Sequence, residues 1–236
     1  MLTPLKPEDA TLDTYQLVGI LLDMPPSRAR NAQSTPASVP GSARERLIAA
    51  AIATVRFKGF SATSVDEICQ AAGVTKGAFF HHFATKEALA VTAAGAWTDI
   101  AEQRIFTLPD WTRLPDPLDR LMGHIDFRLS MLNGPAEDFT CFVGTIVQES
   151  YNSSDPIRAA CDASLRAYAM RLAEDIEQAI ARYGIAQGVT ALSLAYHIQT
   201  VLQGAFILAK ANGHPLLARD SVTHLKRYVA MLFKKE

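Results

Sequence analysis

The sequence predicts an all-α protein, and three observations support this fold class. Apolar residues recur at helical spacing from Gly41 onward, while the alternation typical of strands has little support. Ser and Thr residues that can cap helices precede successive apolar segments, and Gly or Pro residues follow them. No proline occurs between Gly41 and Pro109, so no proline breaks a helix there. The 236 residues, 49% of them hydrophobic, suffice for one or two domains with a sizeable core.

Residues 1–41 are predicted to form a flexible N-terminal extension. They contain six of the 12 prolines and end in MPPSRARNAQSTPASVPG, a composition that does not pack regularly. Ahead of this run, LDTYQLVGILL carries enough apolar residues for one short helix. A frayed tail is the favoured interpretation, because chain termini are often disordered.

Four helices are predicted within residues 42–108. The first begins with Ser42 and Glu45 at capping-box spacing and stops at Gly59. The second, VDEICQAA, follows another Ser and Glu pair at the same spacing and spans about two turns. It ends at Gly73, which supplies the positive φ that a tight helix end requires.

The third and fourth helices begin at threonine caps. Thr75 precedes KGAFFHHF, and Thr85 precedes a long helix that runs to the breaker Pro109. Further helices follow, separated by Gly, Pro and Asn residues. They are expected near residues 115–132, 138–152, 155–183, 190–211 and 217–233.

The longest apolar segment, Val189 to Ala211, is predicted to be a buried helix of a soluble protein. It is interrupted by His197, Gln199 and Gln203, each of which is costly at the centre of a bilayer. The N-terminus has no basic stretch followed by an apolar one, as a secretory signal would. We therefore expect a cytoplasmic protein without membrane contact.

Charge and cysteine content limit the function classes. The formal net charge is -1, so no whole-chain field attracts polyanions and any nucleic-acid site must be local. Residues 42–90 hold six basic residues and four acidic ones. This small positive excess is compatible with a local nucleic-acid site and equally with a solvated helix face. Cys69, Cys141 and Cys161 lack CxxC spacing, which argues against a disulfide framework or a structural zinc site and favours a reducing compartment.

A helix-turn-helix unit is predicted at residues 65–84. Two short helices are joined by a three-residue turn, and Ala71 and Gly73 allow the backbones to approach closely. Thr75, Lys76 and the backbone at Gly77 lie at the N-terminus of the second helix. Free N–H groups and the positive end of the helix dipole favour phosphate there, and the helix is small enough to enter a major groove.

Metal binding and catalysis have little support. His81 and His82 are neighbours on a helix, so their side chains point about 100° apart and cannot share one ion in ordinary geometry. The chain lacks GxxxxGK[ST], GxGxxG, GxSxG and HExxH. We therefore expect no metal site, no cofactor and no enzymatic activity.

The segment GFSATSVDEICQAAGVTKGAFFHHFATKEAL resembles the N-terminal signature of the tetracycline-repressor (TetR) family of bacterial transcription regulators. The resemblance covers residues 42–102. It combines a Gly-aromatic turn, a Thr-Ser pair before the second helix, AGV before the third, KGxxxxHF through it and a Lys-Glu pair that opens the fourth. It implies a three-helix helix-turn-helix DNA-binding domain at 42–102, followed by a helical ligand-binding and dimerisation domain at 103–236.

The resemblance also implies the DNA contacts. Phosphate contacts fall to Thr63, Thr75, His82 and Lys86, while Lys76, Gly77 and Ala78 approach base edges or the backbone in the major groove. Phe80 departs from the family pattern, which usually has Tyr, and its role reduces to stacking on a sugar or packing. The residues expected at the DNA are Thr63, Ser64, Thr75, Lys76, Gly77, Ala78, Phe80, His82 and Lys86.

In the C-terminal domain the resemblance extends only to the layout, which implies that the last two helices pack against their copies in a homodimer. Gly204, Ala205 and Ala209 recur at helical spacing and permit close helix approach, and His224 and Tyr228 can pack from the last helix. Packing within one chain explains the same residues with nearly equal odds.

Polar residues embedded in apolar helix faces are the best markers of a ligand pocket. The expected pocket residues are His124, Phe127, Met131, Cys141, Thr145, Gln148, Gln199 and Gln203. Each one alone is more often a satisfied core residue or an interface residue. Cys141 begins a predicted helix whose dipole can activate a thiol, so it is either an electrophile sensor or a small buried hydrophobe.

The function expected from these features is that of a homodimeric regulator, most simply a repressor that a small-molecule effector releases from a near-palindromic DNA operator. Two reader helices would enter successive major grooves about 34–36 Å apart. The alternative is an α-helical ligand carrier or enzyme that retains a helix-turn-helix without using DNA. Salt-dependent duplex binding distinguishes the two.

Overall fold

The computed structural model of the protein describes residues 41–185 and 188–234. Over these ranges the chain is helical and contains no strand, so the all-α prediction is confirmed. The N-terminal extension, including the short helix considered at LDTYQLVGILL, lies outside the described residues. All peptide bonds in the described ranges are trans.

The first four helices begin where their caps predict. They are α2 (Ala43–Lys58), α3 (Val65–Ala72), α4 (Lys76–His82) and α5 (Lys86–Ala101). Ser42 and Ser64 each form a complete capping box, in which the hydroxyl accepts the backbone N–H of a Glu whose carboxylate accepts in return. Gly73 ends α3 in the left-handed conformation with φ 63°.

The predicted helix from Thr85 to Pro109 is not α-helical throughout. After α5 the chain continues as a π-helix, η2 (Glu102–Thr107), and then as a 3₁₀ turn, η3 (Asp110–Arg113). The wider π turn has one more residue per hydrogen-bonded ring than an α turn. This change rotates the side chains of η2 relative to those of α5.

The remaining helices match the expected ranges with one exception. They are α6 (Pro117–Ser130), α7 (Ala136–Phe139), α8 (Phe142–Ser150), α9 (Asp155–Tyr183), α10 (Ala191–Asn212) and α11 (Leu216–Leu232). The expected helix at 138–152 is split, because Thr140 and Cys141 are extended between α7 and α8. Cys141 is the N-cap of α8 rather than a residue inside a longer helix.

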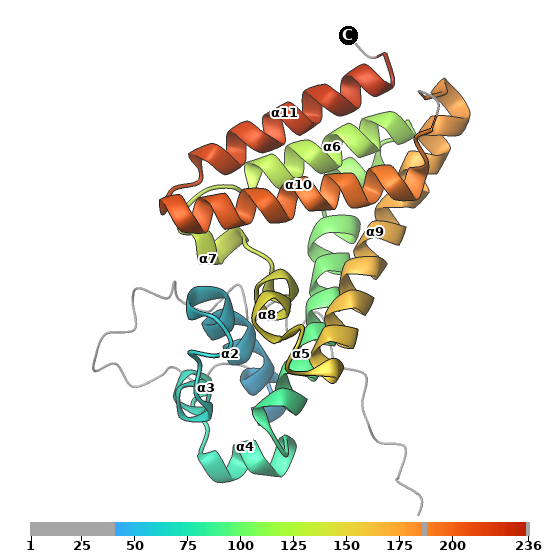
Figure 1. Ribbon diagram of the computed structural model, residues 1–236. Coiled ribbons are helices and arrows are strands. Elements are labelled where there is room, and N and C mark those ends of the chain that lie inside the picture. Colours follow the sequence, from blue (N-terminus) through green and yellow to red (C-terminus); the bar gives the residue numbers. More distant parts are fainter. Residues whose placement is uncertain (1–40, 186–187, 235–236) are drawn as a thin grey trace, which may run out of the picture.

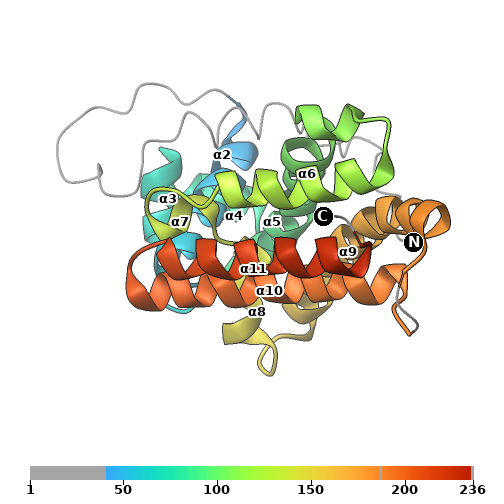
Figure 2. The ribbon, with the colours of Figure 1, turned by 90° about the horizontal axis from the view of Figure 1, so that it is seen from above.

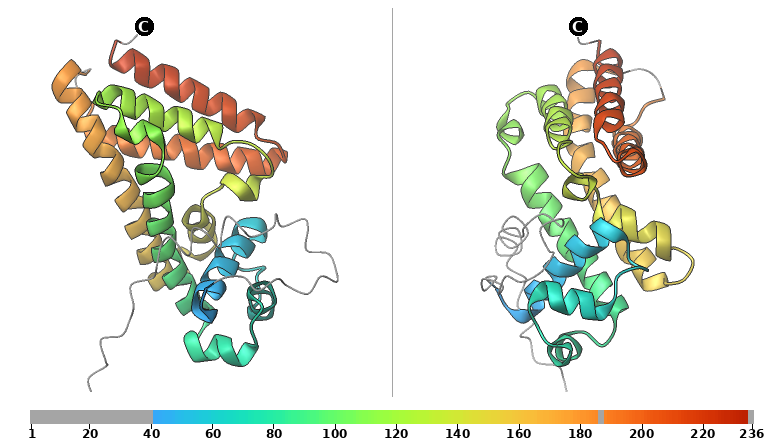
Figure 3. Two further views of the ribbon diagram at one scale, coloured as in Figure 1. Left: turned by 180° about the vertical axis from the view of Figure 1, so that it is seen from behind. Right: turned by 90° about the vertical axis from the view of Figure 1, so that its left-hand side faces the viewer.

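The helices form two groups joined by a central pair. In Figure 1 the small helices α2, α3 and α4 lie at the lower end, and α6, α10 and α11 lie across the upper end. Helices α5 and α9 run side by side between them, as Figure 3 also shows from behind. Seen from above, α10 and α11 lie next to each other along one edge of the upper group (Figure 2).

One hydrophobic core includes residues from both sides of position 102. This core joins buried residues of α2, α3, α4 and α5 with Phe142, Val143 and Ile146 of α8. The start of α9 adds Ile157 and Cys161 to the same core. The second core lies among η2, α6, α9, α10 and α11. Helix α8 therefore packs with the small N-terminal helices although it follows them by about 40 residues in the chain.

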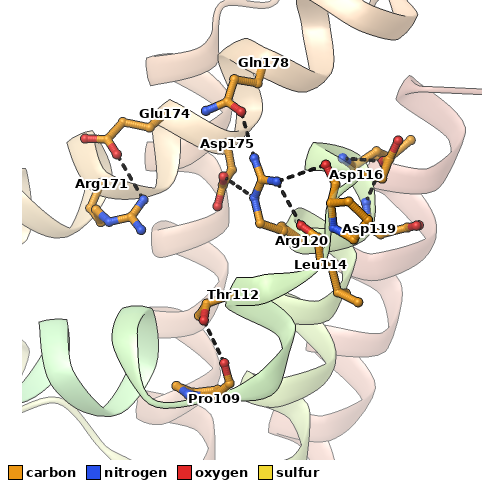
Figure 4. Close-up of polar contacts among 12 residues, drawn as sticks. Pro109, Thr112, Leu114, Asp116, Asp119, Arg120, Arg171, Glu174, Asp175 and Gln178 are labelled. Carbon is orange, nitrogen blue, oxygen red and sulfur yellow. Dashed lines mark hydrogen bonds and ion pairs between the residues drawn. The ribbon is translucent and has the colours of Figure 1, made fainter.

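A buried ion pair fixes α6 against α9. The Nε of Arg120 lies 2.7 Å from Oδ1 of Asp175, and the two side chains are 15% and 7% exposed. The same guanidinium donates to the Leu114 carbonyl and to the Gln178 side chain, as Figure 4 shows. Because the guanidinium has partners on three sides, it locks α9 to the start of α6.

Helix α10 is long and apolar enough to cross a membrane by length and composition alone. It packs along α9 and α11, and its buried residues include Leu194, Ile198, Leu202 and Phe206. Of its most apolar 18-residue window, 39% is buried within the structure.

Candidate functional site

Helix α4 presents its N-terminal residues to the outside. Phe79 and Phe83 on its inner face are 0% and 4% exposed and pack into the core of α2, α3 and α5. Thr75, Lys76 and Gly77 are exposed at the start of the helix, and Thr75 Oγ1 accepts the backbone N–H of Ala78. The buried rings therefore orient the helix so that this first turn faces solvent.

Lys76 is held only weakly within the protein. Its Nζ lies 2.9 Å from Oδ1 of Asp66, and both side chains are more than half exposed. Surface ion pairs of this kind contribute little to stability. The ammonium group is therefore free to exchange Asp66 for another anion at small cost.

Two residues expected at phosphates have structural roles instead. Thr63 is 1% exposed, and its hydroxyl donates to the Gly59 carbonyl at 2.6 Å, so its only hydroxyl proton is already used. Lys86 donates to the carbonyls of Phe60 and Thr63 at 3.0 and 2.9 Å, and its ammonium lies 4.2 Å from the centre of the Phe60 ring. The phosphate contact of Thr63 stays a prediction that requires its hydroxyl to leave the Gly59 carbonyl, and Lys86 holds the turn between α2 and α3.

The other expected residues of this surface differ in exposure. Ser64 is exposed, but its hydroxyl and backbone bond to Glu67 within the α3 cap. Phe80 is 52% exposed, an unusual placement for a phenylalanine. His82 is partly buried, and burial lowers the pKa of its imidazole, assisted by the nearby charges of His81 and Arg44. Both effects disfavour the protonated form of His82 in the protein without DNA.

Glu149 of α8 joins the C-terminal region to the turn after α2. Its two carboxylate oxygens accept the backbone N–H groups of Phe60 and Ser61 at 3.0 and 2.7 Å. Gly59, at φ 92°, permits this approach, because a Cβ built there would lie 2.5 Å from the carboxylate. Sequence patterns mark Glu149 only as a polar residue near a pocket, and they do not predict this contact, because its partners lie 88 and 89 residues earlier in the chain.

A cavity of about 90 Å³ lies where α2, α5, η2, α6, α8, α9 and α10 meet. Of the eight pocket residues expected from the sequence, Met131, Cys141, Gln199 and Gln203 line it. Arg128, another polar residue on the predicted helix at 115–132 that marks a pocket, also lines the cavity. The other wall residues were not expected from the sequence and are chiefly Arg56, Trp97, Arg104, Phe106, Phe139, Tyr168 and Phe206.

Four expected pocket residues do not line the cavity. The Thr145 hydroxyl donates to the Cys141 carbonyl and accepts from the Lys210 ammonium, so both of its hydrogen bonds are made outside the cavity. Gln148 is exposed and donates to the backbone of its own helix, while Phe127 packs at the edge of the second core. Neither side chain is directed at the cavity.

The fourth, His124, lies one layer behind the wall. It is fully buried, stacks on Phe106 with 5.4 Å between ring centres, and shares a 3.0 Å hydrogen bond with the Tyr168 hydroxyl. Burial lowers the pKa of His124 to about 3, and the charge of Arg128 acts in the same direction. Burial also raises the pKa of Tyr168 to about 12. Both rings are therefore neutral at pH 7; Tyr168 forms part of the wall, and His124 supports it from behind.

Cys141 combines the two interpretations given to it. It lines the cavity, is partly buried, and its sulfur caps α8 by accepting the Gly144 N–H at 3.4 Å. Its role as a sensor stays a hypothesis. Over residues 41–185 and 188–234, no group of three or more His, Cys, Asp or Glu side chains is arranged to hold a metal ion.

Two family models match the chain. The model for bacterial regulatory proteins of the tetR family matches residues 47–93, and the model for a tetracyclin repressor-like C-terminal domain matches residues 117–225. The transcriptional regulator AcuR of Cereibacter sphaeroides is 28% identical over 200 residues, which cover 83% of this chain and 90% of AcuR. The regulator LmrA of Bacillus subtilis is 26% identical over 140 residues, 58% of this chain and 73% of LmrA.

Solved structures share the fold. A regulatory protein TetR from Rhodobacter sphaeroides aligns with a TM-score of 0.67 and 26% identity, covering 79% of this chain and 98% of that one. Reduced Escherichia coli NemR aligns with the same TM-score and 22% identity, covering 79% and 96%. The exposed first turn of α4, the two matched models and these relatives agree. The chain therefore belongs to the TetR family of bacterial transcription regulators.

Proposed function

We propose that the protein is a homodimeric repressor that binds a near-palindromic double-stranded DNA operator and leaves it when a small-molecule effector occupies the cavity. The observation that carries the proposal is the exposed first turn of α4, which buried Phe79 and Phe83 hold outward. A helix of this size fits the major groove. In this proposal residues 42–102 bind DNA, residues 103–236 bind the effector and the second subunit, and the protein acts in the cytoplasm.

The residues of this surface divide by role. Lys76, Gly77 and Ala78 lie on the exposed turn and approach base edges, with Lys76 leaving Asp66 to do so. Ser64, Thr75 and His82 flank that turn and serve as phosphate contacts, and Phe80 stacks on a sugar. Lys86 supports the turn between α2 and α3, and from this position its positive charge attracts the phosphate backbone of the DNA.

The dimer interface is assigned to the outer face of α10 and α11, which lie side by side in Figure 2. Large apolar side chains on this face are exposed, which is uncommon in a monomer. They are Leu192, Tyr196, Ile207, Leu208, Leu216, Leu217, Tyr228 and Met231. A Cβ built at Gly204 meets no atom within 4 Å, so a partner helix has room to approach there.

The effector acts in this proposal by favouring a spacing of the two α4 helices that does not fit DNA. Two contacts give the cavity region a path to α2 and the turn after it: Arg56 of α2 lines the cavity, and Glu149 of α8 holds the backbone of Phe60 and Ser61. By linkage, effector and operator must weaken each other's binding by the same factor.

The test is selection of bound duplexes from a random pool, followed by measurement of affinity against salt. A near-palindromic site with an affinity that falls with the logarithm of salt concentration is expected. The Leu208→Glu variant should sediment as a monomer, and Tyr151→Glu, an exposed position after α8, should remain a dimer. Failure to bind any duplex at low ionic strength, or a monomeric native protein, contradicts the proposal.

A further inference from the structure

We propose that the effector is a small organic anion, most simply a carboxylate, whose charged group binds between Arg128 and Arg104. Arg56 then couples binding of this anion to the DNA-binding helices. This inference rests on the proposed function only in taking the cavity as the effector site. It adds the chemical class of the effector and the residues that recognise it.

Arg128 is a buried cation for which residues 41–185 and 188–234 provide no anionic partner. It lies on α6, is 8% exposed, and lines the cavity. Its Nε is buried and has no hydrogen-bond partner within the described chain, and its Nη1 has only the Met131 sulfur at 3.7 Å. The guanidinium lies 5.6 Å from the centre of the Phe206 ring. A buried charge of this kind is costly unless it is paired, so the missing partner is an anion.

Two further guanidinium groups line the same cavity. Arg104 of η2 forms no hydrogen bond or ion pair within residues 41–185 and 188–234, and both burial and the charge of Arg128 lower its pKa. Arg56 of α2 lies 5.0 Å from the centre of the Trp97 ring and donates from Nε to the Thr140 carbonyl at 2.8 Å. Burial lowers the pKa of Arg56 to about 10, and the charges of Arg104 and Arg128 contribute.

The acidic residues of the wall do not neutralise these cations. Glu102 lines the cavity but pairs with Arg171 at 3.7 Å. Asp138 is exposed and, although its charge acts on Arg56, it forms no ion pair within the described residues. Asp138 offsets part of the charge at Arg56, whereas Arg104 and Arg128 have no acidic partner within the described residues, so an anion from outside would relieve their mutual repulsion.

The rest of the wall identifies the anion as organic. Trp97, Phe106, Phe139, Leu202 and Phe206 provide an apolar surface beside the cations. An inorganic anion would leave that surface uncovered, whereas a carboxylate on an apolar body matches both parts of the wall. A carboxylate also matches the two parallel N–H donors of a guanidinium.

Arg56 links this recognition to the DNA-binding helices. It is the wall residue that comes from α2, and it reaches across 84 residues of sequence to the Thr140 carbonyl that precedes α8. An anion in the cavity competes with that carbonyl for the guanidinium. Loss of the bond from Arg56 to the Thr140 carbonyl frees α2 from the segment before α8, and α3 and α4 pack against α2.

The test measures binding to the full-length protein without DNA, by titration calorimetry and by tryptophan fluorescence, since Trp97 lines the cavity. The probes are propionate, hexanoate, benzoate and phenylacetate, each beside its neutral primary amide. At least one acid should bind at least tenfold more tightly than its amide. Arg128→Gln should weaken that acid at least tenfold and leave its amide unchanged, whereas Arg158→Gln, at an exposed position on α9, should change neither.

Folding of each variant is checked by its thermal transition, and Arg104→Gln provides a second variant with the same expected loss. Equal binding of acids and amides, unchanged acid binding by both variants, or no binding by any acid overturns the inference. Operator release is measured separately. If the acid binds but does not release the protein from operator DNA, the proposed function is contradicted and the anion site is retained. If the acid still releases the Arg56→Gln variant from operator DNA, the coupling role of Arg56 is excluded.

Discussion

The His124→Gln substitution tests how the wall of the cavity responds to acid. His124 is 0% exposed, stacks on Phe106, and bonds to Tyr168 through Nε2. Burial lowers its pKa from 6.5 to about 3, so the folded protein resists a proton that the unfolded chain accepts below pH 6.5. Stability is therefore lost as the pH falls from 6.5 toward 3.

The magnitude follows from linkage. Below pH 6.5 this histidine lowers the free energy of unfolding by about 1.4 kcal/mol per pH unit, or about 2 kcal/mol at pH 5 relative to pH 7. Glutamine keeps a group that can bond to the Tyr168 hydroxyl but does not titrate. The variant should thus lose about 2 kcal/mol less than the native protein over the same interval.

Urea denaturation at pH 5, 6, 7 and 8 provides the measurement, at one fixed protein concentration because dimer stability depends on it. The comparison is the difference between the two proteins at each pH, which removes the contribution of the carboxylates. His214→Gln, at an exposed loop position, serves as the control. Parallel pH profiles for native and His124→Gln proteins would refute the assignment of a buried neutral imidazole.

Four further outcomes are expected. Glu149→Gln should lower the free energy of unfolding by about 1–2 kcal/mol, because two backbone N–H donors lose a charged acceptor, and a change below about 0.5 kcal/mol would contradict that contact. Lys86→Met should cost about 1–2 kcal/mol through its two lost carbonyl bonds. Lys76→Met should change the free energy of unfolding by less than about 0.5 kcal/mol but weaken operator binding by about 1–3 kcal/mol, so equal stabilities of the two lysine variants would argue against their different roles. Arg120→Met should cost about 3–5 kcal/mol, since it leaves a buried carboxylate unpaired, and a near-native urea midpoint would exclude that role.

Local signals predicted most of the helix limits. Ser42, Ser64 and Thr75 cap helices at the expected residues, because a cap involves only the next three residues of the chain. The helix expected at 155–183 has those bounds in the structure. Signals of this kind do not depend on distant parts of the fold.

Features that depend on tertiary packing were missed. The π-helix at Glu102–Thr107 continues an uninterrupted helical pattern, so nothing local distinguishes it. Arg56 looks like an ordinary helix-end cation until α7 and α8 bring the Thr140 carbonyl to it. Thr63 was placed at a phosphate by family resemblance, whereas its burial depends on how the turn folds back on Gly59.

The shared core of the small helices and α8 limits how this regulator can be re-engineered. A hybrid cut after residue 102 would strip Phe142, Val143 and Ile146 from the apolar cluster they complete. The transplanted helices α2 to α5 would then pack against a foreign α8 with different apolar side chains. They would also lose the Glu149 carboxylate that accepts the N–H groups of Phe60 and Ser61. Reprogramming by grafting should therefore move α8 together with α2 to α5, or retain all of them and exchange only the outward face of α4.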